Sequence, residues 1–195
     1  LGAGNIPEKA RHAAEESIES IDKMLSDGTK MVFITAGMGG GTGTGAAPII
    51  AREAKSKNIL TIGIVTIPFQ FEGNRKIDQA LDGVEAISKN VDALLVVNNE
   101  RLREIYPELT ISDAFGRADD TLTLAARSIA EIITTHGKIN LDFNDVCTVL
   151  RDGGVAIMST GTGEGELRVK SAIDDALNSP LLYNNGIFDA KKVLL

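Results

Sequence analysis

The order of apolar and polar residues along the chain predicts short buried strands that alternate with helices. The first helix is expected from Pro7 to about Ser26, with proline in its first turn and an apolar stripe along one face. Apolar runs that read as buried strands follow at 31–36, 59–66 and 93–97. Strands that are apolar throughout and separated by helices favour a parallel sheet with helices on both faces.

The second half of the chain begins with a long helix. Helical spacing runs from about Phe115 to His136, and a polar loop follows over 137–142. Beyond the loop the pattern predicts a helix to about 151, a strand over 155–160, a helix over 166–177 and a strand over 191–195. The fold class expected is therefore α/β, with a Rossmann-like parallel sheet and a long central helix over 1–137. Residues 138–195 are expected to hold a loop and the beginning of a second, α+β domain.

Composition and charge exclude several classes of protein. The chain has 195 residues, 43% of them hydrophobic, and 20 basic against 27 acidic side chains give a net charge of −7. No cluster of basic residues is present, which argues against binding to nucleic acid or to an anionic membrane surface. No apolar run approaches the roughly 20 residues that span a bilayer. The single cysteine, Cys147, cannot form an internal disulfide, so a reducing cytoplasmic compartment is expected.

Glycine is concentrated between the first strand and the helix after it. Residues 39–45 read Gly-Gly-Gly-Thr-Gly-Thr-Gly. Glycine allows positive φ and close backbone approach, and amides at a helix N-terminus bind anions. The segment therefore predicts a phosphate-binding loop.

Two other phosphate-binding motifs fit this loop less well. A Walker loop requires Gly-Lys-Ser/Thr, but the only Gly-Lys pair, at 137–138, is followed by isoleucine. A dinucleotide fingerprint is formally present at 41–46, but no acidic residue ends the next strand to bind a ribose. A dehydrogenase-like dinucleotide-binding domain stays as an alternative.

Three segments together resemble the tubulin/FtsZ family of GTPases, and its bacterial cell-division members in particular. They are 36–48, which contains the glycine-rich loop, 68–73 and 140–145. The similarity runs through essentially the whole chain. It implies a GTPase that binds GTP and GDP together with Mg²⁺, without metal ligands assigned to this chain, and that polymerises into the cytokinetic filament of dividing bacteria.

The resemblance also implies which residues bind the nucleotide. The glycine-rich loop would hold the α- and β-phosphates, a second loop would contact the γ-phosphate, and further residues would lie around the ribose and phosphates. The residues of the glycine-rich loop are Gly39, Gly40, Gly41, Thr42, Gly43, Thr44 and Gly45. Those of the second loop are Gly2, Ala3 and Gly4, and those around the ribose and phosphates are Glu72, Lys76 and Asn99. Lys76 stands where these proteins commonly carry arginine, so the charge is kept and the two-pronged guanidinium geometry is lost.

The resemblance implies that residues at the start of the long helix recognise the base and that residues just beyond its other end take part in catalysis. Phe115 and Asp119 share one helix face at i, i+4; the phenyl ring would stack on guanine and the carboxylate would accept from N1–H and N2–H₂. Asn140, Asp142 and Asp145 match the catalytic loop of the family and would orient or polarise the attacking water. Asp142 is also a candidate cap for the following helix.

The length of the predicted helix separates the base-binding residues from the catalytic loop. A helix of about 22 residues is roughly 33 Å long, so one straight helix cannot place both ends on one nucleotide. If both act on the same GTP, the catalytic loop must come from a neighbour, and head-to-tail contacts that repeat without closure give a filament. Polymerisation would then activate hydrolysis.

The resemblance further implies that the chain corresponds to an internal part of such a protein. The family opens with another strand and phosphate loop, and continues into a tail that recruits membrane anchors and division regulators at the division site. We therefore expect this chain alone to be a weak or inactive GTPase. A non-catalytic scaffold that keeps only the fold and its interfaces is a third interpretation.

Overall fold

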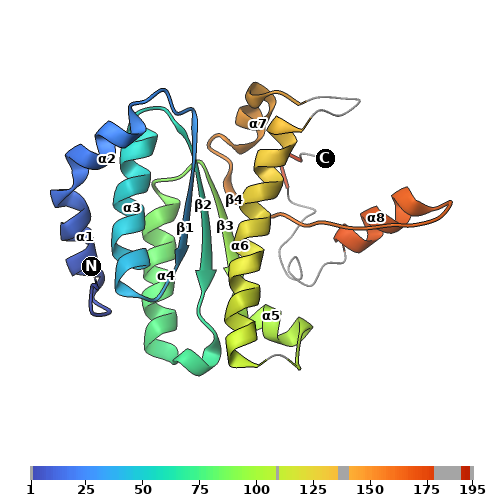
Figure 1. Ribbon diagram of the computed structural model, residues 1–195, viewed down its shortest axis with the longest axis horizontal. Coiled ribbons are helices and arrows are strands. Elements are labelled where there is room, and N and C mark those ends of the chain that lie inside the picture. The colour runs from blue at the N-terminus through green and yellow to red at the C-terminus, as the bar shows by residue number, and fades with distance from the viewer. Residues whose placement is uncertain (1, 109, 136–140, 178–189, 194–195) are drawn as a thin grey trace.

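A four-stranded parallel sheet organises the chain (Figure 1). The computed structural model describes residues 2–108, 110–135, 141–177 and 190–193. The strands are β1 (Met31–Gly37), β2 (Leu60–Ile67), β3 (Ala93–Asn98) and β4 (Gly154–Ala156), and they lie side by side in that order. The α/β fold with a parallel sheet is confirmed.

Helices cover both faces of the sheet, as expected from strands without a polar face. On one face lie α3 (Gly41–Ser56) and α4 (Asn74–Ser88), with α1 (Pro7–Glu16) and α2 (Ile18–Leu25) packed outside α3. On the other face lie α6 (Ile111–Thr134) and α7 (Phe143–Leu150). The short elements η1 (Gln70–Glu72) and α5 (Asn99–Ile105) follow β2 and β3, and α8 (Arg168–Leu177) extends away from the sheet.

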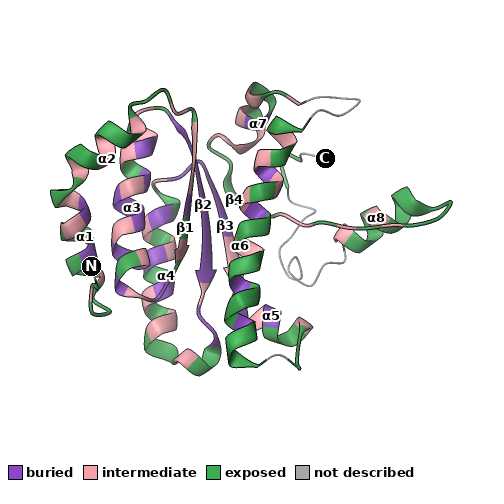
Figure 2. Ribbon diagram, viewed as in Figure 1, coloured by how far each residue is buried: buried purple, intermediate pink, exposed green. Residues whose placement is uncertain are grey.

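Two apolar clusters hold these layers together, and β2, which is buried along nearly all its length (Figure 2), contributes to both. Val65 faces α3 and α4 and packs with Leu94 of β3 and Ile87 of α4. Ile62 and Ile64 face the opposite way, together with Ala125 and Ile129 of α6 and Val146 of α7. Alternate residues of a strand point to opposite faces, so a continuous apolar run is what this central strand requires.

Several boundaries differ from the expected ones. The N-terminal helix is two helices separated at Ser17, and α3 begins at Gly41 instead of near Gly45, where a helix was expected to begin. The long helix begins earlier than expected, at Ile111, because the Thr110 hydroxyl accepts a hydrogen bond from the backbone N–H of Asp113. Helix α5 was not expected, and the strand expected at 191–195 is not formed over 190–193.

The two ends of the sheet differ. Strand β4 pairs with β3, and the backbone N–H of Gly154 donates to the carbonyl of Asp92 at 3.0 Å. Strand β1 pairs only with β2, so its other edge has no partner strand among the described residues. The domain boundary at residue 137 stays a prediction, because 136–140 lie outside the described residues.

Candidate functional site

The carboxyl ends of β1, β2 and β3 meet at one edge of the sheet, where α3, η1 and α5 begin (Figure 1). Ligands of parallel α/β sheets bind outside this edge. The glycine-rich segment, the 68–73 segment and Asn99 therefore lie at one end of the molecule, as their positions after successive strands require.

The turn before α3 is shaped for close backbone approach. Gly39 has φ +91°, and a Cβ atom there would lie 2.6 Å from the carbonyl oxygen of Lys76. Its N–H donates to the buried hydroxyl of Thr44 at 3.0 Å, which closes the turn. Gly40, the N-cap residue, faces open space and gives α3 no side-chain cap. The first amides of α3 are therefore left for an anion.

The other glycines of the segment serve packing. A Cβ atom on Gly41 would lie 2.8 Å from that of Ala3. One on Gly43 would strike the carbonyl of Gly37, and one on Gly45 would strike the carbonyl of Pro7. The glycine-rich segment therefore both exposes backbone amides and lets β1 and α1 approach α3.

The second predicted phosphate loop lies directly beside the first. Gly4 and Asn5 both have φ +58°, and the N–H of Ile6 donates to the carbonyl of Ala3 at 3.1 Å. Ala3 contacts the position of Gly41, as described above. The structure thus brings together two loops that are more than thirty positions apart in the sequence.

Glu72 and Lys76 form an ion pair on this edge. One carboxylate oxygen of Glu72 accepts from the N–H of Phe69 at 3.0 Å, and the other lies 3.1 Å from Nζ of Lys76. The Glu72 side chain is mostly buried, whereas that of Lys76 is 43% exposed. The ammonium group of Lys76 is therefore accessible to an anion, and Glu72 fixes the turn after β2.

Three phenylalanines cluster where η1 meets α6. Phe69 is fully buried and stacks on Phe71 with ring centres 5.0 Å apart. The ring of Phe115 stands edge-on to both, at 5.2 Å from Phe69 and 6.1 Å from Phe71. Such contacts fix ring orientation. Phe115 is nonetheless 41% exposed, so its ring can also contact a ligand.

Asn99 carries an unsatisfied acceptor. The residue is 4% exposed, and its Oδ1 atom has no hydrogen-bond partner among the described residues. An unpaired buried polar group costs about 1–3 kcal/mol, so a donor from a ligand or from water is expected there. The preceding Asn98 caps α5 by accepting from the N–H of Glu100 at 3.0 Å.

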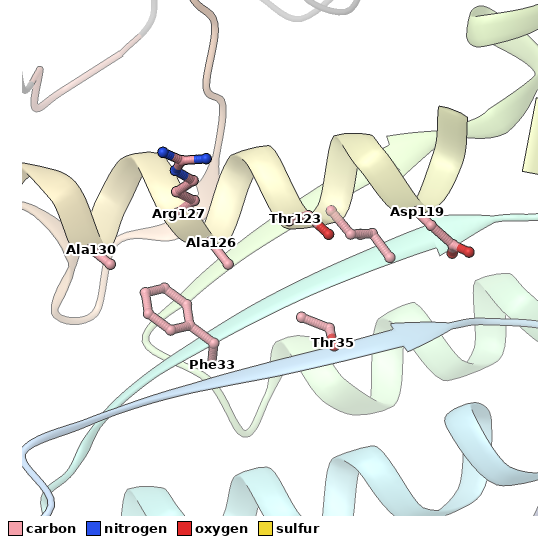
Figure 3. Close-up of a pocket in the computed structure, with 8 residues that line it drawn as sticks. Phe33, Thr35, Asp119, Thr123, Ala126, Arg127 and Ala130 are labelled. Atoms are coloured by element: carbon pink, nitrogen blue, oxygen red, sulfur yellow. The ribbon is translucent and has the colours of Figure 1, made fainter. Parts of the chain in front are cut away.

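Asp119 lines an open groove of about 620 Å³ between α6 and the free edge of β1 (Figure 3). Phe33 and Thr35 of β1 form one wall, and one face of α6 forms the other. Asp119 follows Phe115 by one helical turn, so both lie on one side of α6 as predicted.

The predicted catalytic residues are not part of this edge. Helix α7 lies beside the far end of α6 (Figure 1), whose 24 residues span about 36 Å. Asp142 caps α7 by accepting from the N–H groups of Asn144 at 2.7 Å and Asp145 at 3.0 Å. Asn140 lies outside the described residues, so its place in the site stays a prediction.

The described residues offer neither a cluster of metal ligands nor a membrane-spanning helix. Within them, no group of three or more His, Cys, Asp or Glu side chains is arranged to hold a metal ion. None of the helices that the structure describes is both long and apolar enough to cross a membrane.

No role is predicted from the sequence for three residues that contact the site, Phe69, Phe71 and Gln79. The two phenylalanines follow a buried strand at i, i+2, and this signal could have identified an aromatic cluster. Gln79 gives no such signal, because a polar residue on an amphipathic helix is ordinary.

Comparison with known proteins places this arrangement in a family. A model described as "Tubulin/FtsZ family, GTPase domain" matches residues 1–107. Cell division protein FtsZ of Porphyromonas gingivalis is 66% identical over all of this chain, which covers 43% of that protein. Cell division protein FtsZ of Aquifex aeolicus is 46% identical over all of this chain, which covers 53% of that protein. The chain thus spans about half the length of these curated relatives.

A solved structure agrees with the sequence relatives. The "FtsZ dimer, empty" of M. jannaschii matches with a TM-score of 0.87 and 44% identity, over 93% of this chain and 53% of that one. This family is the one that the glycine-rich loop and the two other segments resembled, and the dehydrogenase-like alternative finds no support in it. The chain belongs to the tubulin/FtsZ family.

Proposed function

We propose that the protein binds and hydrolyses GTP in a head-to-tail polymer whose active sites are shared between neighbouring subunits. One observation supports this proposal: the edge with the glycine-rich segment and the start of α7, with Asp142 and Asp145, lie at opposite ends of α6, about 36 Å apart along its 24 residues. One chain cannot bring both to the same phosphate. A second copy stacked on the first can, and repetition of that contact makes a filament.

The phosphates bind to backbone amides in this proposal. The uncapped start of α3 holds the α- and β-phosphates through residues 40–43, with the positive end of the helix dipole directed at them. The loop at 2–4 contacts the γ-phosphate, and Lys76 supplies a mobile positive charge. Asn99 Oδ1, buried and unpaired among the described residues, accepts a hydrogen bond from a nucleotide hydroxyl.

The guanine base lies against Phe115 and is read by Asp119. Phe69 and Phe71 hold the Phe115 ring edge-on, which leaves its exposed side for stacking. A carboxylate on the same side of α6 accepts from the two N–H donors of guanine. Adenine lacks this donor pair, so Asp119 gives the site its base preference.

Hydrolysis requires the loop of the neighbouring subunit. Its Asn140, Asp142 and Asp145 orient a water molecule toward the γ-phosphorus, whose bond to the bridging oxygen breaks to give GDP and phosphate. Two carboxylates beside a triphosphate repel it unless a cation lies between them. We therefore infer that Mg²⁺ enters with the nucleotide, held mainly by phosphate oxygens and water.

We further infer that the polymer acts in the cytoplasm at the division site. Contacts with membrane anchors and division regulators would be made by segments other than these 195 residues. The names of the relatives support a role in cell division. The scaffold alternative keeps the fold without hydrolysis, and the retained Asp142 and Asp145 argue against it.

Mixing two inactive variants tests the shared site, in a version of the protein extended to the length of its relatives. Gly41→Val places a side chain where Ala3 leaves no room and should abolish GTP binding. Asp142→Asn keeps the helix cap but removes the catalytic carboxylate. Each alone should release little phosphate, and the mixture should recover turnover. Co-sedimentation without recovered turnover at any mixing ratio would exclude the shared site.

A further inference from the structure

We propose that Gln79 is a positioning residue that sets the γ-phosphate loop against the glycine-rich loop, and so lets the site distinguish GTP from GDP. This inference rests on the proposed function. It concerns a residue on α4 that touches both loops and belongs to neither. Its side-chain amide donates to the carbonyl of Gly39 at 2.9 Å and lies 3.4 Å from Oδ1 of Asn5.

The first contact fixes Gln79 to the rigid part of the site. Gly39 is buried, adopts φ +91° and is held by its own hydrogen bond to Thr44. Its carbonyl therefore points in a defined direction. A side-chain amide has two donor hydrogens. One hydrogen bond to Gly39 leaves the second hydrogen free for Asn5.

The second contact acts on a loop that has little else to hold it. Gly2, Gly4 and Asn5 are exposed, and only Ala3 of residues 2–5 is partly buried, against Gly41. Among the described residues, Gln79 makes the one side-chain hydrogen bond to this loop. Asn5 also sits at φ +58°, a conformation that an external contact helps to maintain.

The geometry predicts an effect on one phosphate. The amides at the start of α3 do not depend on Gln79, so the α- and β-phosphates keep their partners when Gln79 is changed. The 2–5 loop loses its tie to Gly39. The affinity for a ligand with a γ-phosphate is therefore expected to fall, while the affinity for a ligand without one is expected to stay unchanged.

The test compares GTP and GDP in a version extended to the length of the relatives. Gln79→Met keeps the length of the side chain and removes the amide. We expect GTP affinity to fall about three- to tenfold, the equivalent of one or two hydrogen bonds, and GDP affinity to change less than twofold. Competition against a fluorescent GDP analogue measures both. Asp82→Ala, at an exposed position on α4, is the matched control and should change neither.

A double-mutant cycle tests the route through Asn5. Asn5→Gly removes the amide of Asn5 and tolerates φ +58°. If Gln79 acts through Asn5, the double variant should bind GTP no more weakly than the worse single variant. Equal losses of GTP and GDP affinity, unchanged GTP affinity, or additive losses would overturn the inference. Failure of the unchanged protein to bind guanine nucleotides would instead reject the proposed function.

Discussion

Asp142 and Asp145 cap the N-terminus of α7 through reciprocal hydrogen bonds. Asp142 Oδ1 accepts from the N–H of Asp145 at 3.0 Å, and Asp145 Oδ2 accepts from the N–H of Asp142 at 3.0 Å. This is a capping box built from two aspartates. The same carboxylates are the proposed catalytic groups, so a mutation that removes one also loosens the start of α7.

Two substitutions of Asp142 separate these roles. Asp142→Ala removes the cap and should destabilise the chain by about 0.5–2 kcal/mol, whereas Asp142→Asn should cost little because asparagine caps equally well. Both should lower GTP turnover by a factor on the order of 10²–10⁴ if the carboxylate polarises water. Urea unfolding of this chain gives the first quantity, and phosphate release by the extended protein gives the second. Normal turnover in Asp142→Asn would leave Asp142 a structural cap only.

Asp119 should determine base preference. Asp119→Ala in the extended protein should weaken GTP and GDP binding by about 1.5–3 kcal/mol for each charged hydrogen bond lost, with little effect on adenine nucleotides. Asp120→Ala, the adjacent exposed aspartate, is the control because it lies one position off the Phe115 face. Competition binding with GTP, GDP and ATP checks both. If only Asp120→Ala changed the selectivity, the residue that recognises the base would be Asp120 and not Asp119.

Gly45 should tolerate no side chain. A methyl group there would strike the carbonyl of Pro7 and crowd Ala10, so α1 would have to move away from α3. We expect Gly45→Ala to destabilise the chain by about 1–3 kcal/mol. Gly116→Ala is the contrasting control: it lies in α6 with nothing within 4 Å of the new methyl group, and should stabilise by about 0.5–1 kcal/mol. Thermal unfolding followed by circular dichroism measures both, and equal stabilities would refute the packing role.

The contact between α2 and α3 should weaken in acid. Hydrogen bonding to Lys57 lowers the pKa of Asp22 below its ordinary value of 3.8. Because the folded pKa is the lower one, the contribution is present above the unfolded value and is lost as pH falls through the folded value. Asp22→Asn should therefore flatten the acid side of the stability profile below about pH 4. Unfolding measured from pH 2 to 7 would show parallel profiles if the ion pair contributes nothing.

The sequence predicted the layers of this fold better than the contacts between them. Apolar runs located β1, β2 and β3 within two residues, because a strand buried on both faces leaves no room for polar side chains. The start of α3 was missed since glycine has low helix propensity, and here close packing against Pro7 and Gly37 outweighs that preference. Helix α5 depends on the Asn98 cap, and one asparagine after a strand is equally typical of a turn.

For the candidate site, too, the sequence predicted the positions of the segments better than the contacts between their side chains. The resemblance named the loops. The helix length predicted that Asp142 and Asp145 lie far from them, and both residues do lie at the far end of α6, whereas their catalytic role stays a prediction. The reciprocal cap, the unpaired Asn99 acceptor and the Gln79 bridge depend on side-chain directions. Those directions follow from tertiary packing, which spacing along the chain does not encode.

The unpartnered edge of β1 has a practical consequence for every assay on these 195 residues. The backbone donors and acceptors along this edge have no partner strand among the described residues, and such a row, beside the groove at Phe33, is a template for strand pairing between molecules. Such pairing needs no guanine nucleotide and joins surfaces other than the two ends of α6. Light scattering that rises with protein concentration but ignores GTP should therefore be assigned to edge pairing. Only a GTP-dependent part of the signal would report growth of the proposed filament.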